Sequence, residues 1–219
     1  MAISHVGAAI ASGETVTLPA HQAGDLILGY GYTATGSVSL PAGWTNLEAW
    51  SVSAFPVTYY GRLAWKVAAS GSESFGTWTN ANISTVAVYR TTGTWRTPTF
   101  ARWTTIGEAP PNLANPGGDN AWFVRMGQTD TPSGWTQRAN SASRYALDSN
   151  RNITGDANSV GTNTDGAGIV TLGISDLAPT GLPVKVYQGG SWVQKPAKRW
   201  NGSAWVEFNP KVWTGSEWK

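Results

Sequence analysis

Glycine and proline interrupt this chain so often that a long helix has little room to form. The 219 residues include 26 glycines and 12 prolines, and the segments between them are rich in Val, Ile, Thr, Tyr and Trp. Short segments of this kind, bounded by turn residues, are typical of β-strands. We therefore predict an all-β protein. The expected strands span residues 14–18, 26–32, 59–67, 84–89, 121–126, 143–148 and 168–174.

The regular spacing of these segments predicts a β-sandwich or jelly roll. The continuous apolar run at 26–28 predicts a strand that is buried on both faces. In the segment 59–67 the side chains alternate instead, which places Tyr60 and Arg62 on one face and Leu63 and Trp65 on the other.

A faint internal duplication lies within residues 1–180, which we expect to form the β-sandwich domain. Gly24-Asp25 precedes one apolar strand and Pro41-Ala42-Gly43-Trp44-Thr45 follows it; Gly118-Asp119 and Pro132-Ser133-Gly134-Trp135-Thr136 flank another. The offsets are 118−24 = 94 and 135−44 = 91 residues, so the two units are nearly in register. We expect both halves to donate strands to one sandwich, and Asp25 and Asp119 to cap the turns where strands begin.

Residues 181–219 form a second region, which carries a tandem repeat with a period of thirteen residues. In each copy an aromatic residue and a tryptophan flank a glycine-centred turn, which predicts a β-hairpin, and Asn201-Gly202 is the strongest such signal. Hairpins of this size cannot bury their tryptophans alone, which favours an interface for assembly and anchoring. The alternative is that the rings only pack on each other, as cross-strand aromatic pairs do. The expected interface residues are Tyr187, Trp192, Trp200, Trp205, Trp213 and Trp218.

No pattern in the sequence predicts catalysis, so we expect no enzyme, no cofactor and no metal site. His5 and His21 are far apart and lie in no metal-binding motif, and neither a Gly-x-Ser-x-Gly elbow nor a phosphate-binding loop is present. Oxygen ligands in the stretch 149–168 could hold Ca²⁺, but its spacing matches no known calcium loop, and we favour Asx-turns there.

Charge and hydropathy exclude two classes of partner. Only 13% of the residues are charged and the net charge is +2, which argues against nucleic-acid binding. No apolar stretch has the length of a membrane helix, and the N-terminus has no signal-peptide pattern. We therefore expect a protein that is made in the cytoplasm, that either stays there or leaves inside something larger, and that binds neither nucleic acid nor membrane.

Several segments together resemble a β-domain of tailed-bacteriophage structural proteins. The resemblance rests on Gly24-Asp25-Leu26-Ile27-Leu28, the segment 40–45, the segment 63–68 and the segment 85–90. The terminal Trp-Asn-Gly-Ser-x-Trp repeats are similar to tails of phage minor tail and fibre-like proteins. This resemblance covers about residues 1–90 and 183–219. It implies a place in the virion and carries over no catalytic residues.

The resulting expectation is a non-enzymatic, surface-exposed structural component of a phage virion, associated with the tail as a minor tail or fibre-like protein that adheres to the host surface. A capsid decoration or head-fibre protein is the first alternative. A carbohydrate-binding module, whose exposed rings would stack on sugars, is an alternative of another class, and a glycan-cleaving tail enzyme is a third. Expected partners are other virion proteins, further copies of the chain, with a trimer favoured, and a host-surface glycan.

Overall fold

The structure is a computed structural model. It describes residues 3–54, 56–102, 113–117, 120–128, 131, 135–141, 144–149, 170–177, 184–188, 191–195, 198–200 and 202–207. The chain divides into two compact units, Met1–Ala178 and Pro179–Lys219. Within the described residues every regular element is a strand and every strand pair is antiparallel, which confirms the predicted all-β class. In that part of the chain no helix has the length and apolar character needed to cross a membrane.

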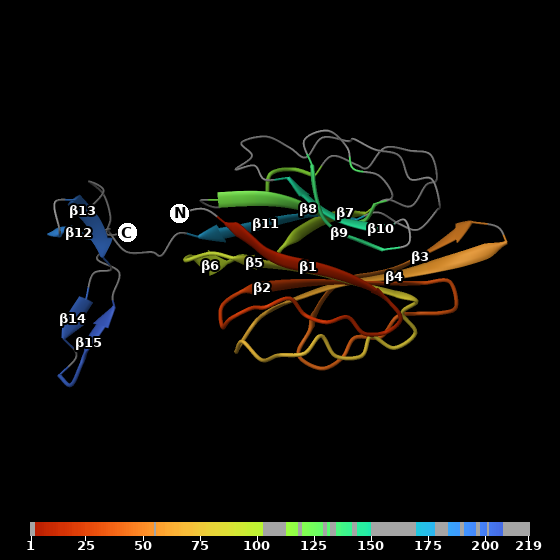
Figure 1. Cartoon of the computed structure of the whole chain (residues 1–219), viewed down its shortest axis with the longest axis horizontal. Coiled ribbons are helices and arrows are strands. Elements are labelled where there is room, and N and C mark those ends of the chain that lie inside the picture. The colour runs from red at the N-terminus through yellow and green to blue at the C-terminus, as the bar shows by residue number, and fades with distance from the viewer. Residues whose placement is uncertain are drawn as a thin grey trace, which may run out of the picture. The chain divides into compact units, whose positions relative to one another are not determined.

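The first sheet is built entirely from the N-terminal part of the first unit. Its strand order is β1-β5-β2-β4-β3. The strands are β1 (Ser4–Ser12), β2 (Leu26–Thr33), β3 (Thr45–Ala54), β4 (Val57–Val67) and β5 (Ile83–Arg90), drawn from red to yellow-green in Figure 1.

The second sheet follows in the chain and repeats this arrangement. Its strand order is β6-β11-β8-β10-β9, with β7 also paired to β11. The short strands β6 and β7 thus take the position of β1, while β11, β8, β10 and β9 take those of β5, β2, β4 and β3. The strands are β6 (Thr94–Trp95), β7 (Thr99–Arg102), β8 (Asn120–Gln128), β9 (Thr136–Ser141), β10 (Arg144–Ser149) and β11 (Val170–Leu177).

Corresponding edge strands of the two sheets carry a β-bulge at corresponding positions. The register of β3 against β4 skips Leu47, and the register of β9 against β10 skips Arg138. Each extra residue lies two positions after the threonine of the Pro-x-Gly-Trp-Thr sequence, Thr45 in the first sheet and Thr136 in the second. A bulge bends its strand and increases the local twist, so both edges are bent at the same point.

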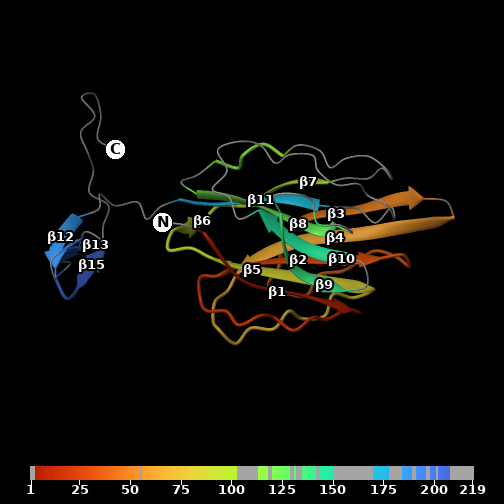
Figure 2. The same cartoon turned by 45° about the horizontal axis from the view of Figure 1, so that its top comes forward.

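One hydrophobic cluster joins the two sheets. Leu28 and Leu63 from the first sheet and Val124 and Leu172 from the second are fully buried members of it. The second sheet lies alongside the first in both views (Figure 1, Figure 2). The strand β2 is buried along its whole length, and the burial on both faces predicted for residues 26–28 is confirmed, because Ile27 on the opposite face packs into a second cluster.

The second cluster covers the outer face of the first sheet with loop residues. Trp78 is fully buried there, and its ring lies over Gly29 and Gly31 of β2. A Cβ atom added at Gly29 would lie 2.5 Å from this ring, so only glycine leaves room for it. The cover also includes Val16 and Leu18.

The described strands confirm most expected segments, with one correction and five additions in the first unit, namely β1, β3, β6, β7 and β9. Segments 26–32, 59–67, 84–89 and 121–126 are strands throughout, and 143–148 and 168–174 are strands wherever they are described. The strand expected at 14–18 is wrong, because this segment joins no ladder and instead lays its apolar residues on the sheet. The strands β1 and β3 went unpredicted because they are rich in Ala, Ser, Gly, Asn and Glu, which have low strand propensity.

The second unit contains two antiparallel strand pairs, each within one copy of the repeat. β12 (Val184–Gln188) pairs with β13 (Ser191–Lys195), and β14 (Lys198–Trp200) pairs with β15 (Trp205–Glu207). Gly202 adopts φ = +104°, a left-handed conformation that suits glycine in a tight connection. The third copy lies outside the described residues.

Candidate functional site

The two described tryptophans of the repeat face each other across a hairpin. Trp200 and Trp205 are directly opposed in the β14–β15 register, and their ring centroids lie 5.8 Å apart at an interplanar angle of 61°. This edge-to-face contact is the favourable geometry for an aromatic pair. The rings nevertheless remain 55% and 66% exposed. Packing against each other therefore does not bury them, and a large aromatic surface stays open to a partner.

The other predicted interface residues are placed only in part. Tyr187 is opposed to Trp192 in the β12–β13 register, which repeats the arrangement of Trp200 and Trp205 at the level of the backbone. The side chains of Tyr187 and Trp192 lie outside the described part of the structure, as do Trp213 and Trp218 altogether.

A hollow of about 230 Å³ lies on the outer face of the first sheet, at the strands β3 and β4. The loop that follows β2 forms one wall. Tyr60 and Arg62 are half-buried beside it, and their neighbours on adjacent strands are all small. Two large side chains among small ones leave a depression in the surface. The hollow is lined by Ser37, Val38, Ala49, Trp50, Ser51, Tyr60, Gly61 and Arg62.

Arg62 brings an unused hydrogen-bond donor to this hollow. Its Nε atom is buried and has no hydrogen-bond partner among the described residues. The ion pairs formed in that part of the chain involve other cations, namely Lys66, Arg90 and Arg102. A buried donor without an acceptor is destabilising, and a shift of this half-buried side chain into the hollow would let Nε meet an acceptor from outside the chain.

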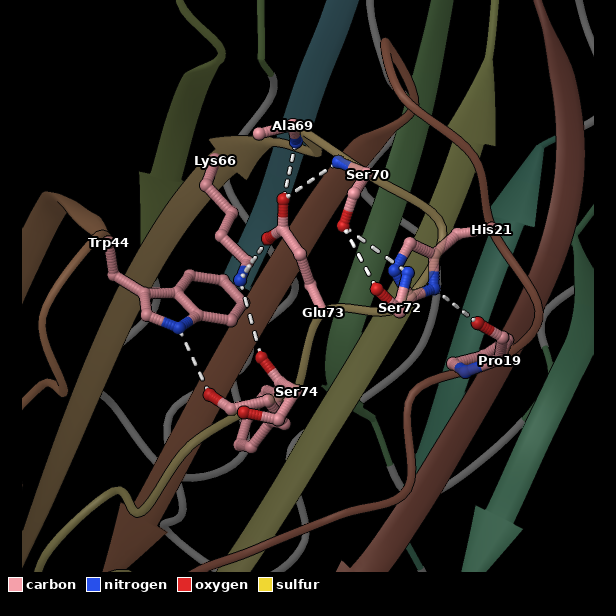
Figure 3. Close-up of polar contacts among 10 residues, drawn as sticks. Pro19, His21, Trp44, Lys66, Ala69, Ser70, Ser72, Glu73 and Ser74 are labelled. Carbon is pink, nitrogen blue, oxygen red and sulfur yellow. Dashed lines mark hydrogen bonds and ion pairs between the residues drawn. The ribbon is translucent and has the colours of Figure 1, made fainter.

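Further along β4 on the same face, a carboxylate holds the loop that follows this strand. Glu73 forms an ion pair with Lys66, with 2.6 Å between Nζ and Oε2, and accepts hydrogen bonds from the backbone N–H groups of Ala69 and Ser70 (Figure 3). The hydrogen bond from Lys66 is the main cause that holds the pKa of Glu73 below its ordinary value. A carboxylate engaged in this way fixes the loop and is not free to act as a general base.

Trp44, from the first Pro-x-Gly-Trp-Thr sequence, completes the same cluster. Its Nε1 donates to the backbone oxygen of Phe75 at 3.0 Å, and Nζ of Lys66 lies 5.2 Å from its ring centroid (Figure 3). Its ring packs edge-on against Trp78. The motif therefore folds a loop onto the sheet, and its tryptophan has a structural role.

Asp25 is a buried carboxylate with a structural partner. Its two oxygens accept hydrogen bonds from Nε and Nη2 of Arg90, both at 2.7 Å, and Oδ2 also accepts from the backbone N–H of Gln22. Burial opposes its ionisation, but the hydrogen bonds from Arg90 and Gln22, together with the nearby positive charge, outweigh burial and lower the pKa of Asp25. The expected turn-capping role is thus present at Asp25, while Asp119 lies outside the described residues.

The two histidines make separate contacts within the first unit. His5 packs edge-on against Tyr89, and Nδ1 of His21 lies 2.8 Å from the backbone oxygen of Pro19 (Figure 3). Among the described residues there is no group of three or more His, Asp or Glu side chains that could hold a metal ion. The stretch 149–168, considered for Ca²⁺, lies outside them except for its first residue.

His5 makes the stability of the first unit depend on pH. Burial, followed by the nearby charge of Arg138, lowers the pKa of His5 from 6.5 to about 4. The unfolded chain therefore binds the proton more readily, and stability decreases as the pH falls from above 6.5 towards 4. We expect a loss of about 1 kcal/mol between pH 7 and pH 5, less than the full shift implies because the side chain is partly exposed.

Urea titrations at these two pH values test this prediction. His5→Phe keeps an aromatic ring against Tyr89 and removes the titrating group, so its stability should change less over the same interval. Equal pH dependence in the wild type and the variant would contradict the role of His5.

The sequence did not predict the hollow, although it did predict which face of the segment 59–67 carries two of the lining residues. Alternation in the segment 59–67 correctly placed Tyr60 and Arg62 on one face, and Leu63 and Trp65 are in the core on the other. That alternation could not reveal that residues 37 and 38 would pass beside them, because this depends on how the loop crosses the sheet.

Comparisons with known proteins leave the chain without an assigned family. A scan against family models, a search of curated proteins and a search of solved structures each found no match.

Proposed function

We propose that this protein is a non-enzymatic structural component of a phage virion, associated with the tail, in which the C-terminal hairpins anchor the chain and the larger β unit faces outward. The observation that carries the proposal is the exposed pair Trp200 and Trp205 on a hairpin too small to bury them. Large, rigid aromatic side chains dominate the energy of many interfaces. The resemblance of the repeats to phage tail components supplies the biological setting.

The partner of these rings is either another copy of the chain or a neighbouring virion protein. A hairpin of three-residue strands cannot provide its own core, so its stability depends on docking. Repeats in tandem favour association of several chains through the same surface, and we favour a trimer. The other aromatic residues of the repeats, Tyr187, Trp192, Trp213 and Trp218, belong to this proposed interface by sequence equivalence.

We further propose that the first unit is a β-sandwich that arose by internal duplication. Three observations support it. The two sheets have corresponding strand orders. Corresponding strands carry a bulge at Leu47 and Arg138. The central pairs also share their register: Leu26 opposite Tyr89 corresponds to Asn120 opposite Asp176, when β2 is shifted by 94 residues and β5 by 87. Agreement of order, register and bulge is difficult to obtain from unrelated sequences.

Quantitative mass spectrometry of purified, nuclease-treated virions tests the virion assignment. We expect the protein to co-purify with isolated tails at a few copies per particle. Copy numbers of tens to hundreds that follow empty heads would instead support the alternative of a capsid decoration or head-fibre protein. Absence from both fractions would remove the virion assignment.

Replacing both exposed tryptophans should abolish self-association. We expect the double variant Trp200→Ala/Trp205→Ala to sediment as a monomer at micromolar concentration, where the wild type forms a trimer. The reason is that truncating an aromatic side chain that is buried in an interface weakens this interface by about 2 kcal/mol or more. Val67→Ala is the matched control, because it removes an exposed apolar side chain from the first unit. A wild-type protein that is strictly monomeric would contradict the self-assembly part of the proposal.

A carbohydrate-binding module is the second candidate, and the same exposed rings favour it. Tryptophan faces that are open to solvent can stack on the apolar faces of sugars. This function predicts glycan binding by the isolated protein that is lost in Trp200→Ala or Trp205→Ala. A receptor-binding virion protein would combine both candidates.

A further inference from the structure

We propose that the hollow at β3 and β4 binds an acidic sugar unit of a polysaccharide, with the sugar carboxylate on Arg62. The proposal concerns a different surface from the tryptophan hairpin and goes beyond the virion role. It requires neither the hairpins nor a virion, so its success or failure is separate from theirs.

Arg62 lines the hollow as a half-buried side chain whose Nε atom is itself buried. On β2 its neighbour is Gly31 and on β3 its neighbour is Ala49. Neither residue can cover the guanidinium or supply a side-chain acceptor. Its Nε has no partner in the part of the chain that is described, and no described carboxylate lies within ion-pair distance of it. The missing acceptor is therefore the strongest indication of a ligand.

The other polar groups of the hollow match a polyhydroxylated ligand. Ser37 and Ser51 contribute hydroxyl groups that can donate and accept hydrogen bonds, and Tyr60, directly opposite Ser51, adds a phenol and a ring edge or face. The backbone at Gly61 forms part of the floor, with the Trp50 ring packed beneath it in the core. The hollow thus has a rigid base and hydroxyl groups on two sides.

Size and charge narrow the class of ligand. A volume of about 230 Å³ is below the roughly 300–1,000 Å³ of pockets that enclose drug-sized ligands, so one sugar unit fits better than several. The planar fork of arginine binds a carboxylate through two parallel hydrogen bonds. One guanidinium balances one carboxylate charge, whereas a phosphate monoester would retain a second negative charge. A uronic acid unit within a longer chain satisfies all three requirements.

Amide chemical-shift titration of the full-length protein tests the site. The probe is trigalacturonic acid, with its methyl ester as the uncharged matched ligand and inorganic phosphate as a second anion. We expect shift changes at residues 37–38, 49–51 and 60–62 and a Kd of about 1 mM, typical of one weak polar site. The ester and phosphate should bind at least about tenfold more weakly.

Variants assign the binding to Arg62. R62Q should weaken binding at least about tenfold, and R62K should be intermediate, because lysine keeps the charge without the fork. Tyr60→Phe tests the phenol with little change of shape. R199Q, on β14 of the second unit, removes the same charge elsewhere and should bind as the wild type does.

Several results would overturn the site. These are no shift changes at about 10 mM probe, equal binding of the ester or of phosphate, and unchanged binding by R62Q with its native spectrum retained. Changes centred on Trp200 and Trp205 would assign sugar binding to the hairpin instead. Detection of the protein in virions without any sugar binding would overturn this site and leave the virion role intact.

Discussion

Trp78→Ala is expected to lower the free energy of unfolding of the first unit by about 4 kcal/mol, within the range of large-to-small replacements in cores. Trp78 is fully buried, stacks on Phe75 with ring centroids 5.0 Å apart, and meets Trp44 edge-on. The space that alanine leaves adjoins Gly29 and Gly31, which have no side chains that could move into it. The cavity therefore persists, which places the loss towards the upper part of the range.

Two further variants make this result specific. Trp78→Phe should lose only about 1–2 kcal/mol, because a ring is retained and Nε1 of Trp78 has no hydrogen-bond partner to lose among the described residues. Trp205→Ala, at a 66% exposed ring, should leave the urea midpoint of the first unit unchanged. Comparable losses in Trp78→Ala and Trp205→Ala would contradict the burial on which the prediction rests.

Arg90→Met is expected to destabilise the first unit by about 3 kcal/mol at pH 7, because it leaves the carboxylate of Asp25 buried without its cation. Asp25 is 1% exposed and receives both of its charged hydrogen bonds from Arg90. The methionine keeps the apolar contacts of the arginine stem, so the loss reports mainly on the charge. Chemical denaturation provides the measurement.

The pH dependence supplies the control for this second prediction. The pKa of Asp25 is lowered in the folded protein, so the stability that its ionised form contributes is present above its ordinary pKa of 3.8 and is lost as the pH falls through the lower folded value. The difference between the wild type and Arg90→Met should therefore shrink under acidic conditions, where a protonated Asp25 no longer needs a cation. A difference that stays constant from pH 7 to strongly acidic pH would indicate that lost packing, and not the ion pair, causes the destabilisation.

The interior strands were predictable because the pattern of apolar and polar side chains along each strand reflects which of its faces are buried. β2 begins with a continuous apolar run and is buried throughout because both of its faces are covered, and β4 alternates because its faces differ. The edge strands β1 and β3 carry small and polar residues, and their strand conformation depends on pairing with a neighbour. The segment 14–18 has strand-like residues for another reason, since it packs its apolar side chains against a sheet without joining one.

Of the two candidate sites, one was predictable from the sequence and the other was not. The tryptophan pair on the hairpin was predictable, because its partners are only five residues apart and a short turn determines their register. The hollow was not, because Arg62 needed Gly31 and Ala49 as neighbours and the loop at Ser37 as a wall.

The sequence by itself therefore determined the all-β class, the interior strands and the aromatic hairpins, since each depends on periodicity and turns over a few residues. Only the tertiary structure decided the strand order, the second cluster over Gly29 and Gly31, the ion pair of Asp25 with Arg90 and the position of Arg62 at the hollow. Each of these joins side chains that are distant in the chain. Their energies depend on exclusion of water and on available space, which exist only after the sheets have assembled.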